Sequence, residues 1–367
     1  MSDDAAQRVN ADALRDFCAA VFEKLDVSAD DAWVTADVLV AADLRGIASH
    51  GVARLRRYVA GLRDGVMIAR PQVRVLTETP ATAALDAGAG LGQPISRRAM
   101  QQAIAKARNA GVGVVTVRNS NHYGIAGYYA MMALENDMIG FSMTNTDVLA
   151  VPTFGRDALL GTNPIAVAMP AGAERPYVLD MATTVVPRGK LEVYDRQGKR
   201  MPLGWATDER GLATDDPTRV LRNFLSRAGG GLLPLGGEGE LLGGHKGYGL
   251  SLLVELLCGV LAGAAYMDLV YPKDAAGKPL PANLGHIFGA LRVDAFRPLD
   301  EYKASMDDAI RRLHNSSKAE GQTRIYIHGE KEFELAERNQ AAGVPLEAKV
   351  VADLKKIGDE IGVPYTL

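Results

Sequence analysis

The amino-acid sequence predicts an α/β fold, and three observations support that class. In the middle of the chain, apolar segments with strand and helix periodicity follow one another in the order strand, loop, helix, strand. Hydrophobic residues make up 47% and charged residues 23%, a balance typical of a globular protein with a large core. Glycine accounts for 39 of the 367 residues, above the average share of about 7%. This excess indicates tight turns and close backbone approaches, or else a biased genome composition.

The N-terminal region is predicted to be helical. Residues 10–43 form two helices, because apolar side chains such as Leu14, Phe17 and Val21 recur at three- and four-residue spacing. Ser28 followed by Asp31 resembles a capping box, in which a hydroxyl caps the start of a helix. A polar loop over residues 43–51 leads into a basic helix over about 52–62.

Residues 71–143 change period and supply the predicted α/β core. Short strands are expected at 73–76 and 82–85, and a β-branched strand at 112–117. Helices are expected at 94–110, with Pro94 in the first turn where a missing N–H costs little, and at 125–136. Residues 138–143 complete the core as another strand.

The remainder of the chain alternates short apolar segments with polar loops. Loops and short strands are expected over 145–190, and residues 198–245 are expected to wrap the surface. Residues 250–265 are apolar nearly all round but contain Glu255 and are too short to cross a membrane, so they predict a core or subunit-interface helix. A helix over 299–313, a strand over 323–327 and a helical tail packed on the N-terminal helices follow.

Charge, cysteine content and the N-terminal sequence exclude several classes of function. The net charge of −3 gives no reason to expect a nucleic-acid partner. Two cysteines, Cys18 and Cys258, exclude a disulfide framework and fit a reducing cytoplasm. Residues 1–16 are polar and lack the apolar segment of a secretory signal. We therefore expect a cytoplasmic protein with no membrane partner, and the scattered histidines predict no metal site.

The segment most similar to the Rossmann dinucleotide-binding fingerprint does not match it. Residues 86–93 read DAGAGLGQ, after a strand and before a helix. The Rossmann fingerprint needs a third glycine for close helix–strand packing, and Gln93 stands there instead. No acidic residue follows the next strand to hold a ribose, so a tight turn is expected.

Three polar, glycine-containing loops are candidates for chemistry. Residues 43–54 combine His50 with Arg45 and Arg54, which are suited to binding a carboxylate, although a capped helix–helix turn explains them equally. Residues 119–124 carry His122 at the end of a strand, where α/β folds bind ligands, or simply cap a helix. Residues 242–249 place Lys246 in a glycine-rich helix start that suits phosphate, or form a flexible turn.

Taken in order, several segments resemble the malate/L-lactate dehydrogenase family, which is unrelated in fold to the Rossmann lactate and malate dehydrogenases. The matching stretches span residues 43 to about 346 and read DLRGIASHGVARLRRY, NSNHYGIAGYYA, GTNPIAVAMP, VLDMATT, PLGWATDERGLATDDP, LPLGGEGELLGGHKGYGLSLLVELLCGVLAG and, more weakly, HGEKEFELAERNQAAGVPL. The resemblance implies a non-Rossmann α/β fold with mixed sheets, a helical N- and C-terminal domain, a homodimer or higher oligomer, and NAD or NADP held partly at the dimer interface. It implies a helical domain over 1–80 plus 331–367, with substrate and dimer contacts, and a dinucleotide-binding domain over 81–330.

The resemblance also implies roles for individual residues. His122 in SNH or His50 in SHG is the proton acceptor and donor, and Arg45, Arg54 and Asn121 lie near the substrate. The cofactor contacts are Thr146, Asn163, Asp180, Met181, Ala182, Lys246, Gly247, His328, Gly329 and Glu330. Thr184, Arg188, His328 and a short insertion at 222–227 depart from the family pattern.

The implied activity is hydride transfer between a nicotinamide and C2 of a small 2-hydroxy or 2-oxo acid such as malate, lactate or sulfolactate. Reduction of a cyclic imine acid is the alternative within enzymes, and a non-catalytic dinucleotide-binding homologue is the alternative outside them. The residues leave open which acid is used, NAD against NADP, and which histidine moves the proton.

Overall fold

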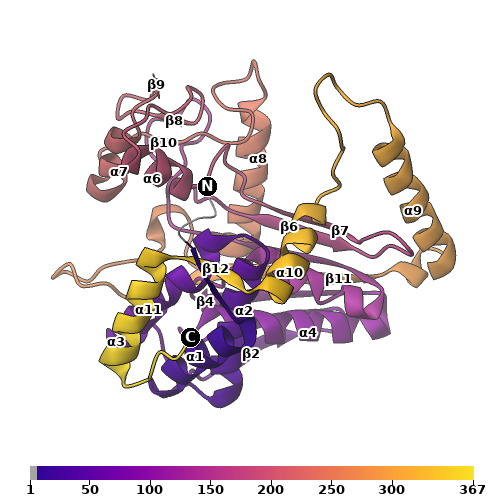
Figure 1. Ribbon diagram of the computed structural model, residues 1–367, viewed down its shortest axis with the longest axis horizontal. Coiled ribbons are helices and arrows are strands. Elements are labelled where there is room, and N and C mark those ends of the chain that lie inside the picture. Colours follow the sequence, from indigo (N-terminus) through magenta and orange to yellow (C-terminus); the bar gives the residue numbers. More distant parts are fainter. Residues whose placement is uncertain (1–5) are drawn as a thin grey trace.

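A seven-stranded mixed sheet forms the centre of the computed structural model, which describes residues 6–367 (Figure 1). Only β3 and β4 pair in parallel, and every other neighbouring pair in this sheet is antiparallel. The α/β class predicted from the sequence is therefore confirmed, as a mixed sheet. In spatial order the strands are β2 (Arg74–Glu78), β3 (Thr82–Asp86), β4 (Val112–Ser120), β11 (Leu284–Arg292), β5 (Met138–Thr144), β6 (Ile165–Met169) and β7 (Tyr177–Met181).

Helices cover both faces of this sheet. On one face, α4 (Gly92–Ala110) and α5 (Ala126–Met131) pack against Val115 and Phe288. On the other face, α8 (Gly244–Glu255) and its π-helical continuation (Leu256–Leu261) pack against Val114 and Ile287. Successive strand residues thus serve opposite faces, as the period of two in a strand requires.

The N- and C-terminal segments form a second core together. It contains α1 (Ala11–Glu23), α2 (Ala29–Leu44), α3 (Leu55–Arg63) and α11 (Ala348–Ile361), while β1 (Ala6–Val9) pairs with β12 (Val344–Glu347). Figure 1 shows α11 beside α3, where Arg56 of α3 forms ion pairs with Asp353 and Glu360. The helical tail therefore packs on the N-terminal helices, as expected. The domain boundaries near residues 80 and 330 stay a prediction.

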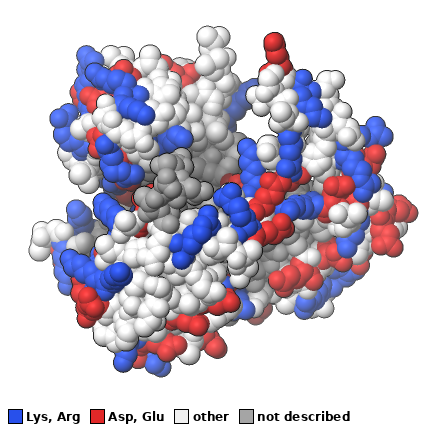
Figure 2. All heavy atoms as spheres, in the orientation of Figure 1, with Lys and Arg blue, Asp and Glu red and all other residues white. Residues whose placement is uncertain are grey.

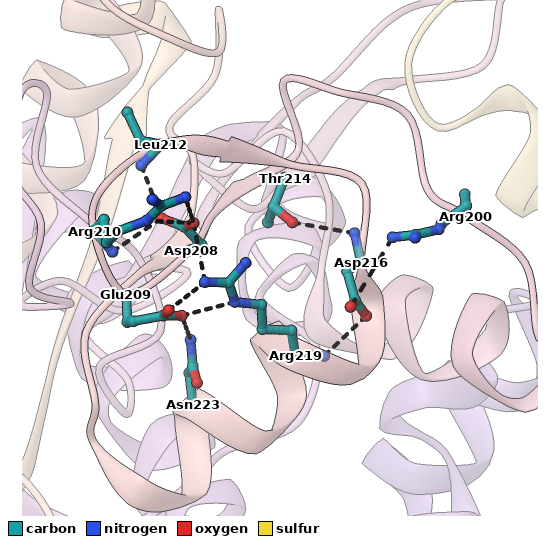
Figure 3. A network of polar contacts seen from close by, with 9 residues as sticks. All are labelled: Arg200, Asp208, Glu209, Arg210, Leu212, Thr214, Asp216, Arg219 and Asn223. Atoms are coloured by element: carbon teal, nitrogen blue, oxygen red, sulfur yellow. Dashed lines mark hydrogen bonds and ion pairs between the residues drawn. The ribbon is translucent and has the colours of Figure 1, made fainter.

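Residues 188–235 form a small lobe, so the expectation that 198–245 wrap the surface is wrong for residues 198–235. The lobe contains strands β8 (Ala206–Thr207), β9 (Ala213–Thr214) and β10 (Gly231–Leu232) and helices α6 (Arg188–Arg196) and α7 (Pro217–Ser226). These elements share an apolar cluster with Ala150, Leu160 and Val186. Figure 3 shows Arg219 of α7 joined to Asp208 and Glu209, with Asn223 donating to Glu209. Glycine and aspartate here form turns within a folded unit.

Two predicted elements differ from the structure. The helix expected at 125–136 ends at Met131, and Leu134–Asn136 form a separate 3₁₀ turn. The strand expected at 323–327 is absent from the described chain, because the Ile327 N–H donates to the Glu330 carboxylate instead of to a neighbouring strand. This segment joins α9 (Leu299–Asn315) to α10 (Glu330–Ala342).

The surface and the helices agree with the sequence in other respects. Figure 2 shows acidic and basic side chains interspersed over one face of the molecule, in keeping with the net charge of −3. Among residues 6–367, no helix is both long and apolar enough to cross a membrane. Cys18 and Cys258 are both buried free thiols.

Candidate active site

The predicted site loops gather along one edge of the seven-stranded sheet. Strand β4 ends at Ser120, opposite Leu284 at the start of β11. Strand β5 ends at Thr144, and β7 ends at Met181, opposite Ile165 at the start of β6. The loops that carry residues 119–124, 145–146, 161–163 and 180–182 therefore start or end at the same edge.

His50 and His122 lie against one another at this edge. Their ring centroids are 5.5 Å apart and the ring planes differ by 21°. Ser49 Oγ lies 2.9 Å from Nδ1 of His50, and the Tyr58 hydroxyl lies 2.6 Å from Nδ1 of His122. Within residues 6–367, neither Nε2 atom has a hydrogen-bond partner. Each ring is thus held through Nδ1 and leaves Nε2 for a ligand.

The partners of His122 indicate its resting tautomer. The Gly124 N–H can only donate, and it points to Nδ1 at 3.4 Å. Burial raises the pKa of the Tyr58 hydroxyl well above its ordinary value, so Tyr58 keeps its proton and can also donate to Nδ1. A neutral His122 with both contacts carries its proton on Nε2.

Two arginines flank the histidine pair. Arg54 donates from Nε to the Ser49 carbonyl at 2.7 Å, and Arg57 donates from Nη2 to the Tyr271 hydroxyl at 2.7 Å. Burial, followed by the charges of Arg54 and Arg57, lowers the pKa of His50 to about 4. Burial and then the Arg57 charge, with smaller contributions from His50 and Arg54, also lower the pKa of His122 well below its ordinary value. Both rings are therefore neutral near pH 7.

A buried carboxyl group fixes the loop that carries His50. Asp43, at the end of α2, is 5% exposed and accepts a hydrogen bond from the Val52 N–H at 2.7 Å. A Cβ at Gly51 would lie 1.9 Å from Asp43 Oδ1, so only glycine permits this approach. Burial raises the pKa of Asp43 to about 7.

Asn121 is held inside the protein next to His122. It is 1% exposed, and its Nδ2 donates to the carbonyls of Ala89 and Gly90 at 2.9 Å each. These carbonyls belong to the glycine-rich turn at 86–93, which is a tight turn as expected. The predicted contact between Asn121 and substrate stays a prediction, because both of its donors already have partners.

Arg45 lies in a separate pocket of about 250 Å³, together with Asp180, His328, Gly329 and Lys331. The Arg45 guanidinium sits over the Phe333 ring at 4.6 Å. Asp180 accepts from the Gly127 N–H at 2.7 Å. Desolvation in the pocket raises the pKa of Asp180 to about 6, against that hydrogen bond and the Arg45 charge. Ile47 and Ile125 line the same pocket, and each lies three residues from one of the two histidines.

Thr146 and Asn163 belong to a further cluster at the sheet edge. Thr146 Oγ1 accepts from the Thr162 N–H at 3.0 Å. Asn163 Nδ2 donates to the buried Glu255 carboxylate at 2.7 Å, and its buried Oδ1 has no partner among the described residues. Glu255 also accepts from Asn145 Nδ2 at 3.2 Å. The acid inside the apolar helix is therefore fully engaged.

The other predicted cofactor residues are spread over three places. Met181 and Ala182 are half-buried at the end of β7. Lys246 is exposed on the first turn of α8, and Gly247 packs so closely on Leu235 that a Cβ would lie 2.2 Å from its carbonyl oxygen. Glu330 is buried and paired with Arg324 and His314.

Sequence reasoning missed four residues of the histidine cluster: Asp43, Arg57, Tyr58 and Tyr271. Arg57 and Tyr58 belong to the motif quoted for the resemblance, and a buried Tyr in a basic helix was an available signal. Tyr271 comes from a distant loop, and only the fold brings it to Arg57.

Comparisons with known proteins identify the family of the chain. The family model described as malate/L-lactate dehydrogenase matches residues 9–355. A malate dehydrogenase of Pyrococcus abyssi is 48% identical over 356 residues, covering 97% of this chain and 95% of that protein. An L-sulfolactate dehydrogenase of Methanocaldococcus jannaschii is 38% identical, covering 94% of each chain. The crystal structure of malate dehydrogenase from Entamoeba histolytica superimposes with a TM-score of 0.94 at 35% identity, covering 99% of this chain and 100% of the other. The chain therefore belongs to the malate/L-lactate dehydrogenase family.

Proposed function

We propose that this protein transfers hydride between a nicotinamide dinucleotide and C2 of a small 2-hydroxy or 2-oxo acid. The observation that carries the proposal is the pairing of two neutral histidines with Arg54 and Arg57 at one sheet edge. An arginine is suited to holding a carboxylate, and a histidine is suited to moving the hydroxyl proton. The names of the relatives, malate and L-sulfolactate dehydrogenase, point to the same class of substrate.

The imine-reductase alternative is less favoured. A ketone needs an acid to protonate the forming alkoxide, whereas an iminium substrate already carries its proton. A histidine whose Nε2 is free of protein partners supplies such an acid when the ring is protonated. The histidine pair argues against a non-catalytic dinucleotide-binding protein.

The residues fit a nicotinamide dinucleotide in part within one chain. The pocket of about 250 Å³ is smaller than the roughly 300–1,000 Å³ typical of drug-sized ligands, so it suits one nucleoside portion. Asp180 offers a carboxylate to ribose hydroxyls, and Asn163 has a spare acceptor. Arg45, His328 and Gly329 line this pocket and would contact this portion. The remaining predicted cofactor residues would act from neighbouring positions: Thr146, Met181, Ala182, Lys246, Gly247 and Glu330. When bound, the cofactor accepts or supplies the hydride.

The protein's own residues then bind the acid and move one proton. Arg54 would hold the C1 carboxylate. In oxidation, the resting ring would first move its proton from Nε2 to Nδ1, where the Tyr58 hydroxyl accepts it, and Nε2 would then take the hydroxyl proton of the acid. In reduction, the doubly protonated ring would give the proton back from Nε2. A positioned acid or base of this kind contributes about 10²–10⁴-fold. His50, stacked on His122, would shield the site and raise the cost of charging the ring.

A homodimer is part of the proposal. Residues 244–261 bury Val254 and Cys258 against the sheet, while Leu253, Leu256, Val260 and Leu261 remain 45–63% exposed. An apolar stripe of this length favours a subunit interface. Substituting Leu256→Asp should yield monomers in sedimentation. The buried free thiols favour a reducing cytoplasm.

The experiment that tests the proposal is a spectrophotometric panel of NADH and NADPH, each against a dozen 2-oxo acids and one cyclic imine acid. The expected result is oxidation of at least one cofactor with a 2-oxo acid. Turnover restricted to the imine acid would favour the alternative, and the panel also decides NAD against NADP.

A further inference from the structure

Two arginines near the start of α3, Arg54 just before the helix and Arg57 within it, form no ion pair. Arg54 and Arg57 are three residues apart, so their side chains lie on neighbouring positions of the helix surface. Among residues 6–367, no carboxylate lies within 4.0 Å of either guanidinium. The nearby Asp147 is engaged by Arg227 at 2.9 Å.

The arginine between them behaves differently. Arg56 turns to α11 and forms ion pairs with Asp353 at 2.7 Å and with Glu360 at 2.9 Å. This segment therefore turns one ion-paired arginine toward α11, while Arg54 and Arg57, which form no ion pair, act on the histidine pair. Because Arg54 and Arg57 lack ion-pair partners and lie beside the histidine pair, this side of the helix is suited to binding an anion.

A substrate with one carboxylate matches only one of these charges. Arg54 donates to the Ser49 carbonyl next to His50, so we assign Arg54 to the C1 carboxylate. Arg57 is fixed 2.7 Å from the Tyr271 hydroxyl, which leaves donors on its guanidinium free to form charge-assisted hydrogen bonds.

We propose that Arg57 binds a second anionic group of the substrate, so the enzyme selects 2-hydroxy acids that carry a carboxylate or sulfonate on C3. This inference rests on the proposed function, because it concerns the same site. Arg57 is then a specificity-determining residue. A monoanionic acid such as lactate has no second anionic group to pair with the charge of Arg57.

The test compares oxaloacetate with 2-oxobutanoate, which has a methyl group where oxaloacetate has its second carboxylate. Wild type should prefer oxaloacetate in kcat/KM. Losing a charged hydrogen bond should reduce kcat/KM of Arg57→Gln for oxaloacetate by about 10–150-fold, with 2-oxobutanoate changed less than about threefold. Arg56→Gln is the matched control, since it removes an adjacent arginine that faces away, and it should keep the wild-type preference.

A fluorescence titration with NADH distinguishes the anion that Arg57 binds. Unchanged NADH affinity in Arg57→Gln is expected. Weaker NADH binding would assign Arg57 to the cofactor diphosphate and overturn the inference. Equal loss on both acids, or no preference in wild type, would overturn it while leaving the proposed function intact. If wild type reduces no 2-oxo acid with either cofactor, the proposed function is wrong and the inference falls with it.

Discussion

The hydroxyl of Tyr58 lies 2.6 Å from Nδ1 of His122, and it joins a helix of the terminal core to a loop of the central sheet. Tyr58 is fully buried, so no water competes for this contact. This contact fixes the orientation of the His122 ring. The Tyr58 hydroxyl can donate to Nδ1 when that nitrogen is unprotonated and accept from it when it is protonated.

Tyr58→Phe removes this partner while keeping the ring. We expect kcat to fall by about 10–100-fold, because the tautomer and orientation of His122 are no longer held, with KM changed little. The free energy of unfolding should fall by about 0.5–1.5 kcal/mol. Tyr128→Phe is the control, since the Tyr128 hydroxyl donates to the Asp37 carboxylate at 2.7 Å and contacts neither His50 nor His122. Equal kcat values in the two variants would show that Tyr58 is only structural.

The low pKa values of the two histidines predict the pH dependence of catalysis. A base with a pKa well below 6.5 is neutral throughout pH 6–8, so kcat/KM for hydroxy-acid oxidation should be flat there. Oxo-acid reduction needs the protonated ring, and its kcat/KM should fall about tenfold for each unit of rising pH. An oxidation profile that bends at pH 6.5 would contradict this prediction.

Asp43 predicts a pH dependence of stability. The unfolded carboxyl ionises near its ordinary value of 3.8, and the folded one near 7, so the folded state binds more protons in between. Stability contributed by this group is present below pH 4 and is lost as pH rises to 7, by up to about 1.4 kcal/mol per unit. Asp43→Asn keeps an acceptor for the Val52 N–H and removes the charge. Urea unfolding at pH 5 and pH 8 measures the free energy of unfolding of both proteins. The free energy of the variant, relative to wild type, should be higher at pH 8 than at pH 5. The same difference at both pH values would refute the raised pKa of Asp43.

Replacing Asn121 distinguishes between a structural role of this residue and the predicted contact with substrate. Asn121→Ala removes the side-chain donor to the Gly90 carbonyl and leaves the Ala89 carbonyl with only the Ile68 N–H, so the free energy of unfolding should fall by about 1–3 kcal/mol. KM for the acid should stay within about threefold in protein that remains folded. A large rise in KM without loss of stability would support the substrate contact instead.

The sequence predicts the central elements well where periodicity and burial agree. The helix at residues 92–110 and the strand at 112–120 each lie within two or three residues of the expected range. The apolar helix expected from residue 250 begins at Gly244, because Gly244 and Gly247 pack on the backbone of Gly237 and Leu235. Local propensity treats such glycines as loop residues, whereas tertiary packing makes them helical.

Other parts of the site depend on contacts that no local pattern contains. Residues 323–327 have strand-like composition, but Tyr326 and Ile327 line the pocket with Arg45. Arg45 and Arg54 lie in one sequence motif. In the folded protein, however, Arg45 lines the pocket with Asp180, whereas Arg54 lies beside the histidines. The meeting of Arg57 with Tyr271, 214 positions apart, is likewise tertiary.

The most direct test of the central claim compares His122→Ala with His50→Ala in steady-state turnover and NADH binding. If His122 moves the proton, His122→Ala should lose at least about 10²-fold in kcat with NADH affinity unchanged, and His50→Ala should lose much less. An unchanged kcat in His122→Ala, with loss in His50→Ala, would contradict the account and move the proton transfer to His50.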